Sequence, residues 1–296
     1  MDIYYSAVGQ GILWGIMGLG LYISFRILGF ADLTSESSFT LGGAVSVFAI
    51  TSDVHPLLAT LLAILAGMTA GWITGILTTY FEISGLLASI ITMTGLYSVS
   101  LGIMQQPNLS LRGYETVFST LIMGVSDKFI VQFGIGILFT SLSVLFLSIF
   151  FRTDIGQAVI ATGDNAVMAD SLGINTPRMM RFALMLANGL IGLSGALIAQ
   201  DNGFADIQLG TGTVVIAFSS IVIGEAIFYR QIKLPYRFIS IILGASLYRV
   251  LLVFVLKLGF DANYFRLLSA LVLAAFLGAP AVFKKIKRFK GGFANG

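Results

Sequence analysis

Long apolar runs constrain this chain more than any other feature of the sequence. Stretches of about 20 residues with few charges, the length that a helix needs to cross the hydrocarbon of a bilayer, recur from one end to the other. Only 10% of the residues are charged and 57% are hydrophobic, whereas soluble domains carry about 25% charged residues. The runs do not alternate apolar and polar residues, as the strands of a membrane barrel would. The sequence therefore predicts an all-α, polytopic helical membrane protein.

We expect about nine transmembrane segments, with eight to ten as the range, because one apolar run is short and others are interrupted. Whether the stretches near 35–50 and 212–228 cross fully or re-enter stays open. A polar connection, residues 105–128, contains a short helix around 116–123 in this interpretation. The expected segments are 7–28, 39–50, 57–80, 85–104, 129–151, 181–199, 212–228, 238–256 and 265–283.

The longest break between apolar runs spans residues 152–181 and carries its own helix start and stop signals. Asp164 or Asn165 can cap a helix through a side-chain oxygen that accepts backbone N–H bonds. Gly173 can end that helix, because glycine adopts the left-handed conformation without a Cβ penalty. The pattern predicts a rigid helix of about two turns outside the bilayer, although an ordinary interhelical loop is the alternative.

Thr176 is expected to cap the next helix, with Pro177 at its first position, where a missing N–H costs nothing. Within the short helix, Ala166, Met168 and Ala169 form the apolar surface that a partner's groove would receive. Isolated short helices are marginal, so caps and docking must hold this one in place.

Basic residues orient the chain. One side collects Arg26, Arg152, Arg178, Arg181, Arg230, Lys233, Arg237 and the basic tail at 284–290, and the other has Arg112, Lys128, Lys257 and Arg266. The positive-inside rule makes the first side cytoplasmic. Nine crossings then place the N-terminus outside and the C-terminus in the cytoplasm.

A repeated tetrapeptide indicates an internal repeat. Gly-Phe-Ala-Asp occurs at 29–32 and again at 203–206, each time after a long helix and before a shorter run rich in small residues. Because an odd helix, 129–151, separates the halves, the second half would be inverted, as is usual along transport pathways. Chance identity of four common residues is the alternative. The chain is thus expected to be a single transmembrane domain, 1–296, with half-repeats of about 1–128 and 177–283.

Polar residues within the apolar segments are the candidates for a translocation pathway. Hydroxyls often bond to their own helix, whereas an amide needs a partner across a helix interface and an intramembrane charge is a functional hypothesis. An arginine well inside the eighth segment can instead extend to the interface. The candidates are Ser35, Ser38, Thr92, Thr94, Asn188 and Arg249.

Other kinds of site are not indicated. The chain has one histidine, His55, and no cysteine, so we expect no metal site, no cofactor and no catalytic residues. Neither a phosphate-binding loop of the Walker type nor a nucleophile elbow occurs, so the chain is not expected to hydrolyse ATP by itself. Glycine stripes at 67–75 and 11–15 favour close helix packing, either within one chain or at a dimer seam.

The break between 152 and 181 resembles the cytoplasmic loop of the permease subunits of bacterial ABC importers for branched-chain amino acids, ribose and nucleosides. The similarity lies in Thr153–Gly156, Gly163–Asn165, Ala169, Gly173–Ile174 and Arg178, with further similarity at 29–43 and 83–95. The sequence departs from the family at Ile223–Glu225 and around Arg249, which leaves the substrate open. A weaker similarity points to members linked to aromatic amino acids.

The resemblance implies a multi-pass subunit of a bacterial plasma membrane, in contact with lipid, that imports a small polar solute. Its partners would be an ATP-binding cassette ATPase, an extracytoplasmic binding protein and a second permease, as a homodimer or a heterodimer; nucleic acid is not expected. The residues that couple it to the ATPase would be Gly163, Asp164, Asn165, Ala169, Leu172, Gly173 and Ile174.

Two other functions remain open from the sequence alone. A secondary transporter driven by an ion gradient needs acidic residues near the midplane, and the sequence places none there clearly, since Glu225 lies near the cytoplasmic end. A membrane scaffold that transports nothing would not need interrupted helices.

Overall fold

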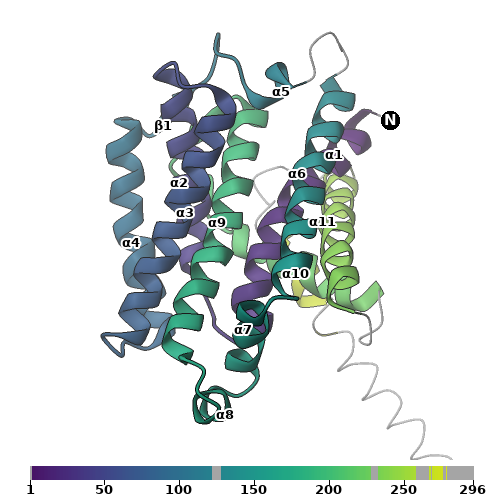
Figure 1. Ribbon diagram of the computed structural model, residues 1–296. Helices are drawn as coiled ribbons and strands as arrows, with labels where there is room; N and C mark the ends of the chain where they lie inside the picture. The colour runs from purple at the N-terminus through teal and green to yellow at the C-terminus, as the bar shows by residue number, and fades with distance from the viewer. Residues whose placement is uncertain are drawn as a thin grey trace, which may run out of the picture.

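The structure, a computed structural model, describes residues 2–121, 128–227, 233–257, 267, 269–275 and 278. It confirms the all-helical prediction (Figure 1). In the described part, six helices are long and apolar enough to cross a membrane, so the count of about nine segments is not confirmed. The expected segment 265–283 lies largely outside the described residues, as do Arg230 and the basic tail at 284–290.

Two helices form the centre of the bundle. They are α1 (Asp2–Leu21), which continues as the π-helical segment η1 (Tyr22–Ile27), and α9 (Thr176–Asn202). Their apolar spans are 83% and 89% buried, whereas the other four spans are 28–44% buried. Only a helix surrounded by protein can be apolar on every face without contacting lipid, and these two carry most of the hydrophobic core.

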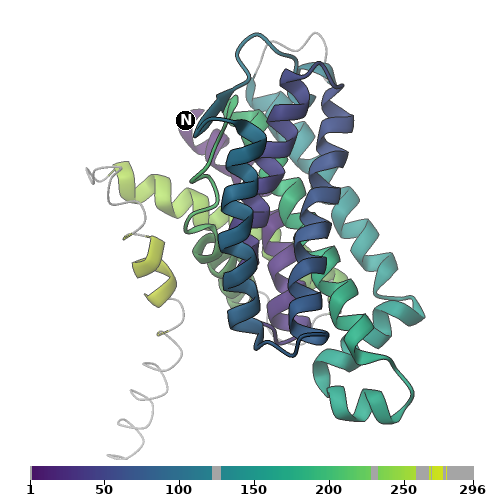
Figure 2. The same ribbon diagram turned by 90° about the vertical axis from the view of Figure 1, so that its left-hand side faces the viewer.

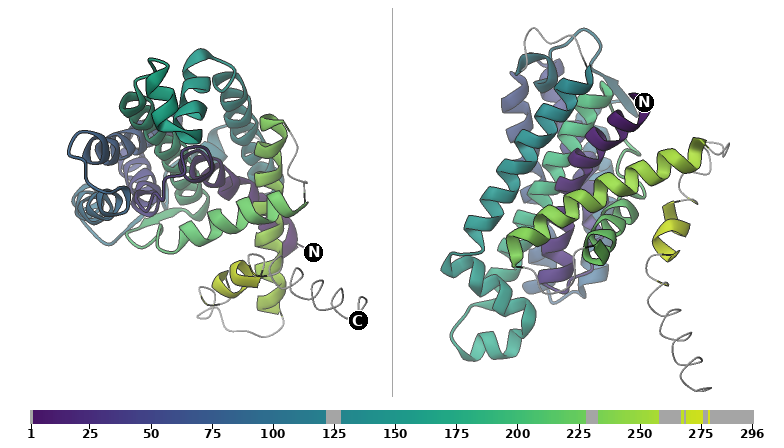
Figure 3. Two further views of the ribbon diagram at one scale, coloured as in Figure 1. Left: turned by 90° about the horizontal axis from the view of Figure 1, so that it is seen from below. Right: turned by 90° about the vertical axis from the view of Figure 1, so that its right-hand side faces the viewer.

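Two groups of helices pack around this centre (Figures 1 and 3). On one side lie α2 (Thr34–Thr51), α3 (Pro56–Thr79) and α4 (Gly85–Met104). On the other lie α6 (Lys128–Phe150), α10 (Thr213–Ile227) and α11 (Leu234–Lys257), which slants across α1. The predicted boundaries at 85–104 are matched, and those at 57–80 and 129–151 are shifted by one residue.

The glycine stripes pack inside the chain. A Cβ on Gly67 would lie 2.2 Å from the carbonyl oxygen of Asn188, and one on Gly71 would lie 2.1 Å from that of Leu184. A Cβ on Gly11 would lie 2.5 Å from the Cα of Ser246. These approaches leave room for hydrogen only, so both stripes serve helix contacts within one chain and not a dimer seam.

The two ends of the bundle differ. One end holds α7 (Asp154–Asp164) and α8 (Ala166–Ser171), which extend below the bundle in Figure 1; we name it the α8 end. The other holds β1 (Asn108–Ser110), β2 (Phe204–Asp206) and the short helix α5 (Val117–Thr120); we name it the β end. The antiparallel pair β1–β2 joins the connection after α4 to the connection after α9.

The repeated tetrapeptide has the same local geometry in both places. Gly29 and Gly203 both have a left-handed backbone, with φ of +67° and +78°. The carboxylate of Asp32 accepts from the backbone N–H two residues later at 2.9 Å, and that of Asp206 does the same at 2.7 Å. The tetrapeptide therefore ends a long helix and turns the chain in both halves, while the half-repeat boundaries stay a prediction.

The helices that follow the two turns run in opposite directions. The last residues of α2 pack with Leu111 and Ala205 at the β end. The last turn of α10 instead contacts η1 at the α8 end through an ion pair between Glu225 and Arg26. This opposition is the arrangement expected of an inverted pair of interrupted helices.

Candidate functional site

The loop at the α8 end contains two capped helices where the sequence predicted one. Thr153 caps α7 by accepting from the N–H of Gly156 at 3.2 Å. Asn165 caps α8 by accepting from the N–H of Met168 at 3.0 Å, whereas Asp164 is the last residue of α7. Gly173 follows α8 with φ of +84°, as predicted. Side-chain caps therefore fix the starts of both helices of this loop.

The cap of α9 corrects a prediction by one residue. Asn175, and not Thr176, accepts from the N–H of Arg178 at 3.1 Å, so Thr176 begins the helix and Pro177 is its second residue. An asparagine side chain caps as well as a threonine one, and it stands where the chain leaves the turn at Gly173.

Two of the three residues expected on the outer face of α8, Ala166 and Met168, are exposed. Val167, Met168 and Leu172 are 82%, 60% and 70% exposed. Ala169 is 2% exposed, so the expectation that it contributes to the partner-facing surface is wrong. Its carbonyl accepts from the N–H of Ile174 at 3.1 Å, which closes the turn after α8. Ala169 packs α8 against the rest of the chain, and the three large side chains are exposed.

Gly163 seats α7 against the first helix. A Cβ at this position would lie 1.8 Å from the carbonyl oxygen of Ile27, at the end of η1. Because backbone cannot yield as a side-chain tip can, only glycine fits this contact. The loop is thus in direct contact with the segment that leads to the turn at Gly29 and to α2.

Buried polar side chains surround that turn. Asn188 donates to the carboxylate of Asp32 at 2.7 Å, and its amide oxygen accepts from Ser38 at 2.6 Å. Ser35 donates to the carbonyl of Asp32 at 2.8 Å. Asp32, Asn188, Ser35 and Ser38 are all buried. Buried polar groups of this kind stabilise one geometry when their bonds are made, so this cluster fixes α2 to α9.

The starts of α2 and α10 meet inside the bundle. The N–H of Gly212 donates to the Glu36 carboxylate at 2.9 Å, and the N–H of Gly210 donates to the Thr40 hydroxyl at 3.0 Å. At about 1.5 Å per residue, α2 and α10 are about 27 and 22 Å long, compared with a hydrocarbon core of about 30 Å. Their starts meet between the two ends of the bundle, and a carboxylate there is stabilised by the N-terminal end of α10.

A pocket of about 420 Å³ opens beside this meeting point, between α2, α4 and the loop after β2. Figure 2 shows α4 at the front of the molecule with that loop beside it. Small-molecule sites have volumes of about 300–1,000 Å³. Of the described residues, those that line it are Glu36, Ser37, Thr40, Met93, Thr94, Tyr97, Ser98, Ile207, Gly210 and Thr211.

The predicted pathway residues separate into three places. Ser35, Ser38 and Asn188 lie together around Asp32. Thr94 lines the pocket, whereas Thr92 is buried and bonds back to the carbonyl of Ala88.

Arg249 lies elsewhere, with its guanidinium carbon 5.1 Å from the centre of the Trp14 ring. This cation–π contact joins α11 to α1, and Arg249 is not among the residues that line the pocket. Arg249 thus contacts an aromatic ring of the bundle, and its assignment to the pathway stays a prediction.

Two acidic residues of the interior were missed. The sequence places no carboxylate clearly at the midplane, yet Asp32 is buried and Glu36 lines the pocket. The signal was present in Glu36, an acid within a run of serines after a helix break. The interior does contain acidic residues, so a lack of them cannot be used as an argument against a secondary transporter.

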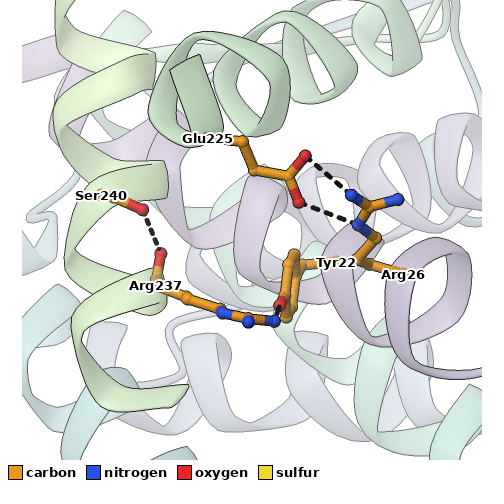
Figure 4. A network of polar contacts seen from close by, with 5 residues as sticks. All are labelled: Tyr22, Arg26, Glu225, Arg237 and Ser240. Atoms are coloured by element: carbon orange, nitrogen blue, oxygen red, sulfur yellow. Dashed lines mark hydrogen bonds and ion pairs between the residues drawn. The ribbon is translucent and has the colours of Figure 1, made fainter. Parts of the chain in front are cut away.

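A second polar network lies at the α8 end (Figure 4). The guanidinium of Arg26 binds both carboxylate oxygens of Glu225, at 2.8 and 3.0 Å. Arg237 donates to the hydroxyl of Tyr22 at 3.4 Å. These bonds connect η1 to α10 and α11, away from the pocket.

Comparison with known proteins identifies the family of this chain. The family described as "Branched-chain amino acid transport system / permease component" matches residues 3–277. The chain belongs to this family of ABC transporter permeases. This confirms the resemblance drawn from the sequence.

Similar proteins support the family membership. The chain is 37% identical to a tyrosine transport system permease protein of Clostridioides difficile (strain R20291), over 92% of this chain and 89% of that protein. It is 32% identical to an autoinducer 2 import system permease protein of Yersinia enterocolitica, over 56% of this chain and 45% of that protein. The solved structure "PsaBC from Streptococcus pneumoniae in complex with Fab" matches with a TM-score of 0.50 and 15% identity, over 93% of this chain and 87% of that one, which supports the permease fold.

Proposed function

We propose that this permease is the transmembrane subunit of an ATP-driven importer and that α8 docks it on an ATPase subunit. The observation that carries the proposal is the outer face of α8, where Val167, Met168 and Leu172 are more than half exposed on a helix with a cap at its start and a glycine at its end. Large apolar side chains exposed outside a bilayer mark a protein interface.

The α8 end is cytoplasmic in this proposal. Arg152, Arg178 and Arg181 lie in or beside α7–α9, and Arg26 and Arg237 lie at the same end. Arg112 belongs to the β end, and Lys257 ends α11 away from α8. An excess of basic residues at one end favours the cytoplasm, which puts the N-terminus outside, where an extracytoplasmic binding protein would deliver substrate.

The pocket beside Glu36 is the translocation pathway in this proposal. It opens past α4, where Tyr97 is 51% exposed and Thr94 and Ser98 are also exposed. Polar groups that face lipid inside the bilayer are costly, so a second permease copy covers this side. A homodimer with the pathway between its copies satisfies this requirement.

An aromatic amino acid is the proposed cargo. The tyrosine transport permease is similar over nearly the whole chain, and Tyr97 and Met93 give the pocket an aromatic and an apolar wall. The residues at 163–174 transmit the ATPase movement: Val167, Met168 and Leu172 contact the ATPase, while Gly163 and Ala169 hold α7 and α8 on the permease.

The test is co-purification of the tagged permease with its ATPase after Met168→Glu. A charge in the middle of an apolar contact should reduce the recovered ATPase at least tenfold, since an unpaired buried charge is strongly unfavourable. Tyr114→Glu is the matched control, because Tyr114 is a 43% exposed apolar residue at the β end.

Equal recovery from both variants would show that α8 is not the docking element. If no ATPase associates with the parent permease and uptake in vesicles follows an imposed ion gradient, the importer proposal itself fails in favour of a secondary transporter.

A further inference from the structure

We propose that Glu36 binds the ammonium group of a free amino acid as it passes through the pocket between α2 and α4. The inference rests on the proposed function, because it names the substrate class and the recognising residue of the same pathway. It predicts that this permease discriminates its cargo by charge within the membrane, in addition to any selection by a binding protein.

The first observation that supports this proposal is the charge of the pocket. Among the described residues that line it, Glu36 is the only charged side chain, and hydroxyl groups are present on Ser37, Thr40, Thr94, Tyr97, Ser98 and Thr211. A carboxylate among hydroxyls favours a ligand with a cationic group over an anion or a neutral sugar. Charge-assisted bonds of this kind are about twice as strong as neutral ones, and more so where water is scarce.

The geometry holds the carboxylate in place. One Glu36 oxygen accepts from the N–H of Gly212 at 2.9 Å, and the wall behind it is fixed by the bond from Gly210 to Thr40. A Cβ on Gly210 would lie 1.9 Å from the carbonyl oxygen of Glu36, so the loop and α2 are in backbone contact. An ionised carboxylate accepts about four hydrogen bonds, so a bond to Gly212 is compatible with one to an ammonium group.

The rest of the pocket suits an amino acid with a large side chain. Met93, Tyr97 and Ile207 supply apolar and aromatic contact, and Ser98 and Thr211 supply hydroxyl groups that can donate to a carboxylate. The volume of about 420 Å³ is within the range of small-molecule sites. The pocket therefore offers Glu36 to the ammonium group of an aromatic amino acid, hydroxyl groups to its carboxylate, and apolar and aromatic side chains to its ring.

The competing role for Glu36 is structural, as a side chain that only fixes the loop at Gly212. Two variants separate these roles. Glu36→Gln keeps an oxygen at the same reach, so it retains the bond to Gly212 and loses the charge. Glu36→Asp keeps the charge and shortens the side chain, so it weakens the bond to Gly212.

The experiment uses the permease reconstituted in proteoliposomes with its ATPase and binding protein. The first readout is ATP-dependent uptake of labelled tyrosine, of a mixture of the other labelled amino acids, and of labelled ribose and nucleosides. ATP hydrolysis and the elution profile in detergent are measured alongside. Glu36→Gln should lower uptake at least tenfold with ATPase association retained, and Glu36→Asp should keep more uptake than Glu36→Gln. The control is Glu115→Gln, at an exposed carboxylate of the β end.

The order of the two variants decides the proposal when uptake is expressed per amount of permease in the main elution peak. Uptake by Glu36→Gln equal to the parent, or above that of Glu36→Asp, would overturn it and leave Glu36 with the structural role. A parent that takes up labelled ribose or nucleosides, but no amino acid, would overturn the ammonium assignment and leave the importer intact. A parent with no ATP-dependent uptake of any of these solutes would count against the proposed function instead.

Discussion

The two ends of the bundle are fastened across the repeat by residues at matching positions but with different chemistry. Arg26 and Gln200 each lie three residues before the glycine of the repeated tetrapeptide. Arg26 binds Glu225 of α10, and Gln200 donates to Ser46 of α2 and to Thr60 of α3. Each long helix is thus tied to the interrupted helix of the other half.

The contacts of Gln200 and Arg26 lie at matching positions of the repeat, but their exposure to solvent differs. Gln200 is 3% exposed, and its side-chain amide oxygen also accepts from the backbone N–H of Val117 at 2.9 Å. Arg26 and Glu225 have side chains that are 43% and 36% exposed. A buried neutral network is costly to open, because each group left unsatisfied loses its hydration. An exposed ion pair exchanges its partners with water at little cost.

This comparison suggests that the β end stays closed while the α8 end, next to the loop that would meet the ATPase, can separate. The charged contact lies at the end that carries the proposed ATPase contact, and the buried one lies at the end where β1 pairs with β2, next to the loop that lines the pocket. If the two ends differ in this way, opening the Gln200 contact costs more free energy than opening the ion pair between Arg26 and Glu225.

The largest effect is expected at Gln200. Gln200→Met keeps the volume of the side chain and removes its bonds, which leaves the Val117 N–H and two hydroxyls to find other partners. We expect a loss of about 2–3 kcal/mol in the free energy of unfolding, measured by thermal unfolding in detergent. Gln208→Met, at an exposed position, is the control and should change stability little. Equal effects of the two variants would remove the contrast between the ends.

A smaller and local effect is expected at Ala169. Because this alanine is 2% exposed, Ala169→Glu should release α8 from the permease, at a cost of about 2 kcal/mol from overpacking and burial of a charge. Hydrogen exchange of the α8 amides should accelerate while that of α9 stays unchanged. Ala166→Glu, an exposed site on the same helix, should leave exchange unaltered, because an acid is tolerated at a helix start. Unchanged exchange in Ala169→Glu would mean that α8 is not held by this side chain.

The elements predicted well from the sequence depend on local information. The length of the apolar runs determined α3, α4 and α6 to within a residue, and Asn165 and Gly173 marked α8 because caps and left-handed glycines act within a few residues. The tetrapeptide at 29–32 and 203–206 was recognised for the same reason, since its turn geometry is contained in the motif.

The features that could not be predicted from the sequence depend on contacts between distant segments. Glu36 and Gly212 are far apart in the chain, so their bond and the pocket beside them follow from the way α2 and α10 meet. The burial of Ala169 depends on how α8 packs, and the place of Arg249 depends on Trp14 of α1. Hydrophobicity alone does not predict these contacts, because nearly every segment of this chain is apolar.

The smallest effect is expected for the ion pair at the α8 end. Replacing Arg26 and Glu225 by glutamine, singly and together, gives a double-mutant cycle whose interaction energy measures the pair alone. For side chains this exposed, we expect about 0.5–1 kcal/mol in low salt, with most of it lost in 0.5 M NaCl as the charges are screened. The same rise in salt should leave the effect of Gln200→Met unchanged, because that network is neutral and buried. An interaction of about 3 kcal/mol that persists in high salt would mean that the pair is shielded from water, and the α8 end would then be as firmly closed as the β end.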